Sequence, residues 1–228
     1  MLFDVDGTLT DYDTAERAGL LRHLETTGVA PADPSAAVSE WRALQEREYA
    51  RYVAGELDFA GQRRARAGAM LGWLGSPARD EAGLDAWFAG YAAAYEAAVV
   101  LFEDVTGCLD ALGDLPLGIV SNSDPEHQRA KLARAGILDR FRCLVCSGGA
   151  GVAKPDPGIF RLACAELGVA PAEVLYVGDR LDVDARAAAA AGLTGVWLDR
   201  SGVGQEPPDV ARITDLGQLP ALVGEVVR

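Results

Sequence analysis

The sequence has no run of about 18 uninterrupted apolar residues, which a membrane-spanning helix would need, although 50% of its 228 residues are hydrophobic. The N-terminus also lacks the basic patch and apolar stretch that form a secretion signal. We therefore expect a cytoplasmic protein without a membrane partner. The length allows one core, or one core with a smaller insert.

Positive charge is scarce, with 21 Lys and Arg residues against 34 Asp and Glu residues and a formal net charge of −13. This balance argues against a nucleic-acid partner, because phosphate backbones are bound by basic surfaces. It leaves room for a small anionic substrate. A cleft that holds a divalent cation and a lysine is locally positive even on an acidic protein.

Cysteine is rare as well, and the 4 cysteines are Cys108, Cys143, Cys146 and Cys164. The spacing of Cys143 and Cys146 matches one half of a zinc site, but no second Cys or His pair completes it. Both lie in a stretch that is typical of a buried strand. We expect four reduced cysteines in the core and no disulfide.

The N-terminal part of the chain is predicted to be almost entirely helical. Its first apolar stretch, Met1-Leu2-Phe3, is short for a strand, so either the sheet starts late or the natural start lies upstream. From 13 to 98 the apolar residues follow helical periodicity. Four helices are expected there: one capped by Asp13 or Thr14 and ending near Gly28, one opened by Pro34-Ser35, one capped by Asp58, and one through 84–95.

The rest of the chain alternates short apolar runs with amphipathic stretches. The expected strands are 117–120, 143–146, 174–177 and 194–198, and the expected helices are 125–135, 157–167 and 183–191. Continuous apolar runs are typical of strands buried on both faces of a parallel sheet. We predict an α/β fold in which a Rossmann-like parallel-sheet core, 1–12 and 99–228, carries an inserted all-helical cap domain at 13–98.

Polar residues follow the predicted strands at their carboxyl ends, where open α/β sheets bind ligands. They are Asp4 and Asp6 in Asp4-Val5-Asp6-Gly7-Thr8, Ser121-Asn122, Lys154-Pro155, and Gly178-Asp179 with Asp182 and Asp184 beyond it. Each element alone has an ordinary interpretation as a turn, a helix cap or a solvated loop. Together, in order and each at a strand end, they predict one site.

These motifs resemble those of the haloacid dehalogenase superfamily of hydrolases, specifically phosphatases with a helical cap inserted after the first motif. The matching stretches are Phe3 to Thr10, Ile119-Val120-Ser121-Asn122, Lys154-Pro155-Asp156-Pro157, and Val177-Gly178-Asp179 with Asp184. The resemblance covers essentially the whole chain. It is much weaker in the residues of the helical segment than in the four motifs.

The resemblance implies Mg²⁺-dependent hydrolysis of a phosphomonoester. Asp4 would attack phosphorus and form an aspartyl-phosphate. Asp6 would protonate the leaving oxygen and then take a proton from the attacking water, while its backbone carbonyl, like a carboxylate oxygen of Asp4, would bind the metal. Gly7 and Thr8 would let the backbone turn tightly beneath the site.

The other motifs would supply the remaining ligands. Ser121 and the backbone of Asn122 would hold phosphoryl oxygens, and Lys154 would neutralise charge on Asp4 and on the transferred group. Asp179 would bind Mg²⁺ directly. Asp184 would act through a water or orient the site, with Asp182 as the alternative. Arg180 stands where such phosphatases often have a small residue, and it would be exposed or would touch substrate.

Three other functions stay open. A sugar phosphomutase shares the Asp-x-Asp pair and the helical cap but keeps its phosphoryl group from water. A 2-haloacid dehalogenase needs no metal and lacks the second aspartate, which is present here as Asp6. A non-enzymatic binding protein would have no reason to keep the charged elements together.

The expected partner is a small phosphorylated metabolite, either a nucleoside monophosphate or a sugar phosphate, and the expected assembly is a monomer or a homodimer. Residues that could select the substrate lie at the cap entry and within the cap: Tyr12, Asp13, Arg17, Arg42, Arg47, Arg51, Arg63, Arg64, Tyr49, Tyr52 and Phe59. The arginines can equally form a solvated helix face, and the aromatic residues can equally be cap core.

Overall fold

The computed structural model describes residues 1–205, 207 and 209–226. The chain forms two compact units, a core unit of Met1–Tyr12 with Val100–Arg228 and a helical unit of Asp13–Val99. Within the described ranges, no helix combines the length and the hydropathy that a membrane span requires.

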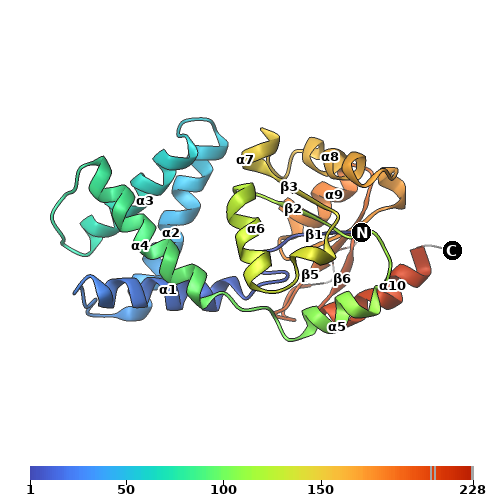
Figure 1. The fold of residues 1–228 in the computed structure, drawn as a ribbon, viewed down its shortest axis with the longest axis horizontal. Coiled ribbons are helices and arrows are strands. Elements are labelled where there is room, and N and C mark those ends of the chain that lie inside the picture. The colour runs from blue at the N-terminus through green and yellow to red at the C-terminus, as the bar shows by residue number, and fades with distance from the viewer. Residues whose placement is uncertain (206, 208, 227–228) are drawn as a thin grey trace. The chain divides into compact units, whose positions relative to one another are not determined.

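The core unit contains a six-stranded sheet with the order β3-β2-β1-β4-β5-β6, in which every neighbouring pair is parallel (Figure 1). Its strands are β1 (Leu2–Phe3), β2 (Gly118–Ser121), β3 (Cys143–Cys146), β4 (Leu175–Gly178), β5 (Thr194–Leu198) and β6 (Ala211–Ile213). The chain order reverses between β1 and β4. Ligands of open α/β sheets bind at the carboxyl ends of the strands at such a point.

Helices of the core unit cover both faces of this sheet. They are α5 (Asp104–Ala111), α6 (Pro125–Arg134), α7 (Ser147–Ala150), α8 (Pro157–Leu167), α9 (Arg186–Ala190) and α10 (Leu219–Val226). Shorter turns are η1 (Leu138–Arg140), η2 (Pro171–Glu173), the π-helical turn η3 (Leu181–Ala185) and η4 (Leu216–Gln218).

Two apolar clusters, one on each face, hold the sheet between its helices. Phe3 of β1 belongs to the cluster that contains residues of α5 and α6, including Leu109 and Leu132. Its neighbour Leu2 belongs to the other cluster, with Phe160 of α8. Successive residues of a strand point to opposite faces, so a strand covered on both sides must be apolar throughout.

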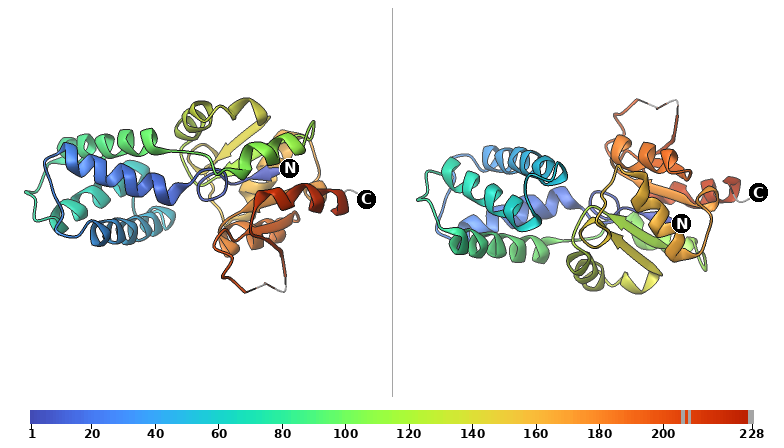
Figure 2. Two further views of the ribbon diagram at one scale, coloured as in Figure 1. Left: turned by 90° about the horizontal axis from the view of Figure 1, so that it is seen from below. Right: turned by 90° about the horizontal axis from the view of Figure 1, so that it is seen from above.

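The helical unit consists of α1 (Tyr12–Thr26), α2 (Pro34–Val53), α3 (Phe59–Trp73) and α4 (Glu81–Ala98), which Figure 2 shows from two further sides. Asp33 and Asp58 cap α2 and α3 through hydrogen bonds from backbone N–H groups. Trp41 of α2 lies in the core of the unit, edge-on to Trp87 at 5.6 Å and to Tyr91 at 4.6 Å between ring centroids.

The predicted fold class is confirmed, because a parallel α/β sheet carries a run of helices inserted between β1 and β2. The predicted strands 143–146 and 194–198 have the observed bounds of β3 and β5. All four cysteines are buried and free, as predicted.

Some elements differ from the prediction. The helix predicted at 183–191 is divided into η3 and α9, and α1 begins at Tyr12, so Asp13 lies in the first turn and is not the cap. The short elements α5, α7 and β6 and the C-terminal α10 were not predicted from the sequence. Strand β6 has the sequence Ala-Arg-Ile, which carries no apolar run.

Gly195 is the point at which β5 touches the turn that carries Asp184. A Cβ at this glycine would lie 2.0 Å from the carbonyl oxygen of Ala185, the last residue of η3. We expect Gly195→Ala to lower the free energy of unfolding by about 1–3 kcal/mol, the usual cost of overpacking. Urea or thermal unfolding measures this change.

Gly107→Ala is the matched control, because Gly107 lies in α5 and a Cβ there would meet nothing within 4 Å. This substitution should be neutral or stabilise by up to about 1 kcal/mol, since alanine is the better helix former. If both variants have wild-type stability, the close packing of β5 on η3 is not a constraint.

Candidate active site

The loop after β1 begins the candidate site. The backbone N–H of Asp4 donates to the carbonyl oxygen of Val177 in β4 at 2.9 Å, so the strand pairing extends to this aspartate. Gly7 then turns the chain with a φ of +82°, and a Cβ there would lie 2.4 Å from Oδ2 of Asp179. Both the backbone conformation and the close approach of Asp179 therefore require glycine at this position.

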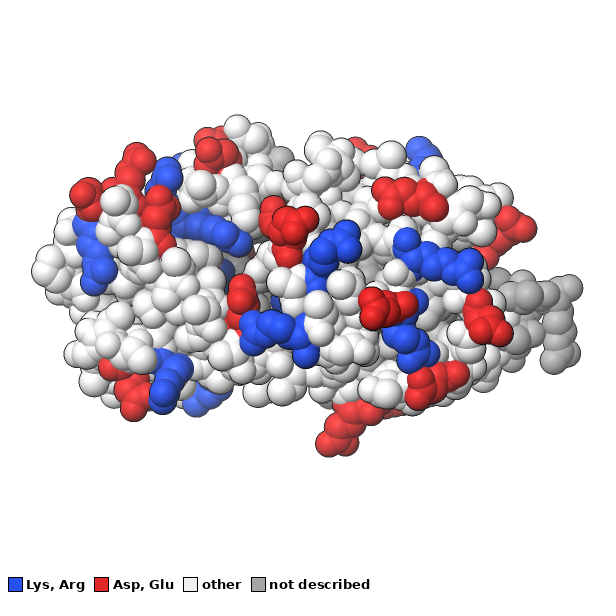
Figure 3. All heavy atoms as spheres, in the orientation of Figure 1, with Lys and Arg blue, Asp and Glu red and all other residues white. Residues whose placement is uncertain are grey.

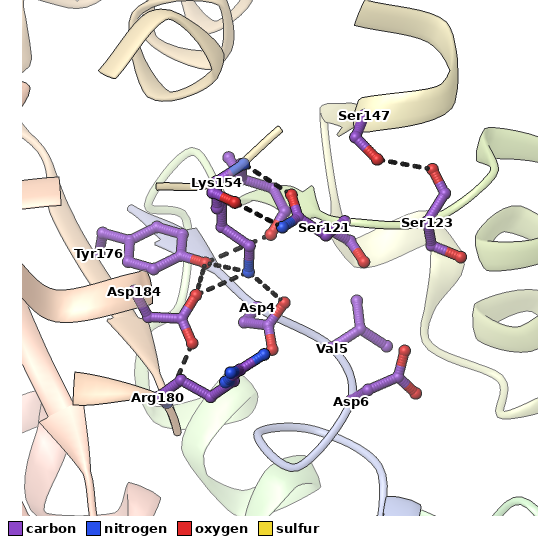
Figure 4. Close-up of polar contacts among 12 residues, drawn as sticks. Asp4, Val5, Asp6, Ser121, Ser123, Ser147, Lys154, Tyr176, Arg180 and Asp184 are labelled. Carbon is purple, nitrogen blue, oxygen red and sulfur yellow. Dashed lines mark hydrogen bonds and ion pairs between the residues drawn. The ribbon is translucent and has the colours of Figure 1, made fainter. Parts of the chain in front are cut away.

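The ammonium group of Lys154 lies between groups from three parts of the core unit (Figure 4). Its Nζ donates to Oδ1 of Asp4 at 2.6 Å, to Oδ1 of Asp184 at 2.6 Å and to the hydroxyl oxygen of Tyr176 at 2.9 Å. An ammonium has three N–H donors, and these three acceptors match them. Burial alone would lower the pKa of Lys154, but the charges of Asp184 and Asp4 raise it above its ordinary value.

Asp184 is fully buried and its two oxygens are fixed separately. Oδ1 lies 2.9 Å from the hydroxyl of Tyr176, and Oδ2 accepts from the backbone N–H of Arg180 at 3.0 Å. The alternative ligand Asp182 is exposed instead and pairs with Arg186 at 2.7 Å. The structure therefore brings Asp184, and not Asp182, to Lys154. Arg180 is itself exposed.

Three carboxylates gather beside Lys154, and they form a group that can hold a metal ion. Asp4, Asp179 and Asp184 each offer an oxygen, and these atoms all lie within 4.8 Å of one another. Oδ1 of Asp179 is buried and, among the described residues, has no hydrogen-bond partner. One lysine does not neutralise three carboxylates, and hard oxygen ligands suit Mg²⁺, so the residues present fit this ion.

Burial raises the pKa of two of these carboxyl groups. Burial, opposed in part by Lys154, raises the pKa of Asp4 to about 7. Burial and then the charges of Asp4 and Asp184 raise the pKa of Asp179 to about 8. Without a cation the cluster thus favours bound protons, because like charges repel and water is excluded.

Ser121 and Asn122 end β2 at the same edge of the sheet. The side chain of Asn122 bonds the backbone of Lys154 twice: Nδ2 donates to the carbonyl oxygen at 2.8 Å, and Oδ1 accepts from the N–H at 2.7 Å. Asn122 therefore fixes the loop that carries the lysine. Ser121 is buried, and its hydroxyl oxygen accepts from Nε2 of Gln128 at 2.9 Å. The phosphoryl contacts expected of these two residues stay predictions.

The side chain of Asp6 does not join the three clustered carboxylates among the described residues. Figure 4 shows it directed away from Lys154. It lies against α6, where Lys131 Nζ donates to Oδ1 at 2.5 Å and Gln128 Nε2 donates to Oδ2 at 2.9 Å. The hydroxyl of Thr10 is 3.3 Å from Oδ1. Asp4 and Asp6 thus have separate surroundings although they are two residues apart.

Three of these partners were not predicted from the sequence, namely Tyr176, Gln128 and Lys131. Tyr176 lies within the apolar run of β4. The one indication in the sequence was its hydroxyl group, two residues before Gly178-Asp179. Gln128 and Lys131 are three residues apart on α6, so they share one helix face. Polar residues on the face that also carries the buried Leu132 were the signal for them.

Most arginines proposed to select a substrate are ion-paired within the helical unit. Arg42 pairs with Asp13 and Glu16, Arg47 with Glu48, Arg51 with Glu48 and Glu56, and Arg64 with Asp85 and Glu81. Arg63 lies over the rings of Phe59 and Phe88, at 4.1 and 5.1 Å from their centroids. On the face drawn in Figure 3, basic and acidic side chains are interspersed.

The chain matches the model of haloacid dehalogenase-like hydrolases over residues 1–192, and it belongs to this family. Phosphoserine phosphatase of Thermus thermophilus is 41% identical over 105 residues, which are 46% of this chain and 42% of the relative. N-acylneuraminate-9-phosphatase of Homo sapiens is 31% identical over 133 residues, 56% of this chain and 54% of the relative. The matches thus span about half of these phosphatases, or less.

Dehalogenases are also similar. The (S)-2-haloacid dehalogenase of Xanthobacter autotrophicus is 33% identical over 179 residues, which are 78% of this chain and 66% of the relative. A structure of L-2-haloacid dehalogenase from the same organism superposes with a TM-score of 0.75 at 26% identity, covering 98% of this chain and 97% of the other.

The HAD-hydrolase YfnB of Bacillus subtilis, in a structure bound to magnesium, has a TM-score of 0.82 at 22% identity and covers 97% of this chain and 96% of its own. At this identity the likeness shows the shared fold. The expected family and its α/β fold are therefore confirmed.

The raised pKa values of the buried carboxyls predict how stability depends on pH and on Mg²⁺. The carboxyls of Asp4 and Asp179 have an ordinary pKa of 3.8 and values of about 7 and about 8 in the folded protein. Between these values the folded state binds more protons than the unfolded state, so these groups lower stability as the pH rises through this window. The metal-free protein should unfold at a lower temperature at about pH 8.5 than at about pH 6.

Magnesium at about a hundred times its dissociation constant should add about 2.7 kcal/mol of stability. For a chain of this size, this corresponds to a rise of about 5–10 °C in Tm. At one fixed Mg²⁺ concentration the rise should be larger at the higher pH, because the carboxylates are ionised there and bind the ion more tightly. Asp179→Asn should reduce both the fall with pH and the response to Mg²⁺, while Asp182→Asn should keep both. If adding Mg²⁺ does not change the Tm of the wild-type protein, the proposed metal site is wrong.

Proposed function

We propose that this protein is a Mg²⁺-dependent phosphatase that hydrolyses small phosphomonoesters through an aspartyl-phosphate on Asp4. The observation that carries the proposal is the cluster of Asp4, Asp179 and Asp184 at the switch point of a parallel sheet, in which Asp4 and Asp184 are paired with the ammonium of Lys154. A second aspartate, Asp6, follows at the same edge. The loops at this edge of the sheet therefore carry a nucleophile, cation ligands, a positive charge and a proton carrier.

The chemistry proceeds in two displacements. A carboxylate oxygen of Asp4 attacks phosphorus as the bond to the leaving oxygen breaks, and the leaving oxygen takes a proton from Asp6. A water then attacks the phosphorus of the aspartyl-phosphate and gives its proton to Asp6. The bond from phosphorus to Asp4 breaks, inorganic phosphate leaves, and both carboxyls return to their starting state.

The carboxylates of Asp4, Asp179 and Asp184, with the backbone carbonyl of Asp6, are the groups that would hold Mg²⁺. When bound, the ion supplies positive charge that offsets repulsion between Asp4 and an anionic phosphoryl group. Lys154 contributes further positive charge at Asp4. Because its three donors are matched by Asp4, Asp184 and Tyr176, it would have to share or exchange one of them to donate to a phosphoryl oxygen.

Dehalogenation of a 2-haloacid is the second candidate, because dehalogenases are among the matched relatives. A halide leaves as a stable anion, so this reaction needs neither a proton donor nor a cation. It would give no role to Asp6, and it would leave three carboxylates beside one lysine without compensation. These two features favour the phosphatase.

The proposed substrate class is drawn from the phosphatases among the relatives. The two phosphatases named above act, by their names, on small phosphorylated molecules. We propose a small phosphorylated metabolite, such as a nucleoside monophosphate or a sugar phosphate, as the substrate of this chain. A phosphomutase on the same residues would differ by returning the phosphoryl group to a sugar. The absence of nucleic-acid and membrane partners, the cytoplasmic location and the monomeric or homodimeric state stay predictions.

We propose that the helical unit serves as a cap that gates the site. The chain leaves the core a few residues after Asp4 and returns before β2, and the two connections are bonded to each other. The N–H of Asp11 donates to the carbonyl of Val100 at 3.0 Å, and that of Phe102 donates to the carbonyl of Leu9 at 3.1 Å. Such paired connections can act as a hinge. A crosslink that locks them should slow turnover of a large substrate.

A panel of small phosphomonoesters with Mg²⁺ tests the function directly. We expect phosphate release from several of them and complete loss of release with EDTA. Asp4→Asn should lower kcat at least about a thousandfold, because removing a covalent nucleophile disables the whole sequence. Asp182→Asn, an exposed aspartate near the same site, is the control and should retain activity.

Chloride release from 2-chloropropionate in the presence of EDTA, without phosphate release from any ester, would overturn the proposal in favour of a dehalogenase. Release of neither product would favour a binding protein. Conversion of a sugar phosphate to its isomer, faster than hydrolysis, would identify a mutase.

A further inference from the structure

Helix α6 presents two buried polar side chains to the site. Gln128 is fully buried and Lys131 is 4% exposed, although Gln and Lys are rarely buried in proteins. Neither residue belongs to the motifs described above. Burying a lysine ammonium is costly unless a charge and hydrogen bonds compensate for it. The compensating groups therefore indicate what these residues do.

The two side chains bind opposite oxygens of one carboxylate. Lys131 Nζ donates to Oδ1 of Asp6 at 2.5 Å, and Gln128 Nε2 donates to Oδ2 at 2.9 Å. Two donors on different oxygens fix the rotation of a carboxylate as well as its position. The hydroxyl of Thr10, 3.3 Å from Oδ1, adds a third contact from the first loop itself.

Gln128 also connects Asp6 to Ser121. Its Nε2 donates to the hydroxyl oxygen of Ser121 at 2.9 Å while it donates to Asp6. This amide orientation suits the ionised form of Asp6, which only accepts and which takes the proton of the attacking water in the second displacement. Since Ser121 accepts from Gln128, its own proton is directed to another acceptor. A phosphoryl oxygen is the acceptor that the proposed reaction would bring to this edge.

We propose that Gln128 and Lys131 are positioning residues: Lys131 holds the carboxyl of Asp6 for proton transfer to the leaving oxygen, and Gln128 holds Asp6 and the Ser121 hydroxyl in register. This inference rests on the proposed phosphatase function, in which Asp6 gives and takes the proton. Displacements of about 1 Å can cost a reaction about a hundredfold, so the fixed placement of Asp6 has a direct kinetic meaning.

Two substrates with different leaving groups distinguish a positioning role of these residues from a general structural role. An alkoxide is a poor leaving group and needs the proton from Asp6 as the bond to phosphorus breaks. A nitrophenolate leaves without a proton. The ratio of kcat/KM for an alkyl phosphate to that for 4-nitrophenyl phosphate therefore reports the proton donor. Because the ratio is taken within one preparation, a lower fraction of folded protein cancels.

Lys131→Met keeps the length of the side chain and removes its charge. We expect kcat/KM for the alkyl phosphate to fall by about 10–100-fold, which is a partial loss of the roughly 10²–10⁴-fold that general acid catalysis contributes. For 4-nitrophenyl phosphate we expect a change below about 3-fold, since that reaction does not draw on the acid. Lys131→Arg should recover most of the loss, because it keeps a charged donor.

Gln128→Met should behave differently, because Gln128 also holds Ser121. Both substrates should lose about 10-fold or more, as phosphoryl binding is common to both reactions. Arg129→Met is the control for charge: Arg129 is an exposed cation on the same helix, and its loss should leave the ratio unchanged.

The outcomes distinguish this inference from the function on which it rests. Equal losses on both substrates for Lys131→Met, or no loss, would overturn the role of Lys131 while the wild type remains a phosphatase. If Gln128→Met has wild-type kcat/KM for both esters, the link between Asp6 and Ser121 is overturned. A wild-type protein that releases no phosphate from either ester would overturn the proposed function, and the inference with it.

Discussion

One buried ammonium group and the carboxylates around it connect the loops at the carboxyl edge of the core sheet. Lys154 bonds to Asp4 after β1 and to Asp184 in the turn after β4, and its own loop is tied to the end of β2 by Asn122. Buried charges are tolerated only when they are paired, so each of these loops depends on the others for its placement. Gly7 and Gly178 allow the close approach that the pairing requires.

The same arrangement leaves an excess of negative charge. Asp179 adds a third carboxylate, and burial raises its pKa to about 8. A protein that only needed a stable core would be better served by an apolar residue here, because burying like charges together opposes folding. The cluster is understandable when a divalent cation completes it. This surplus of charge, together with Asp6, separates the proposed phosphatase from a dehalogenase of the same fold.

The sequence was sufficient for the α/β fold, the inserted helices and the convergence of Asp4, Lys154, Asp179 and Asp184, because strand-end motifs in a parallel sheet meet at one edge. It was not sufficient for residues whose role depends on side-chain direction. Tyr176, Gln128 and Lys131 lie in ordinary strand and helix patterns, and only their placement shows that they touch the site. The roles of the arginines in the helical unit could not be predicted either, since ion pairing with Asp and Glu depends on tertiary packing.

The central position of β1 has a consequence for how the molecule is made. Leu2 and Phe3 pair with β2 on one side and with β4 on the other, so the partners of this strand are translated long after it. While the chain emerges from the ribosome, the segment that carries Asp4 stays unpaired until the strands near residues 118 and 175 have appeared. Contacts of such large sequence separation form late, because closing a long loop has an entropic cost. Asp4 precedes both partner strands in the chain and is therefore among the last residues to be placed, so the candidate site is complete only when the core unit has folded.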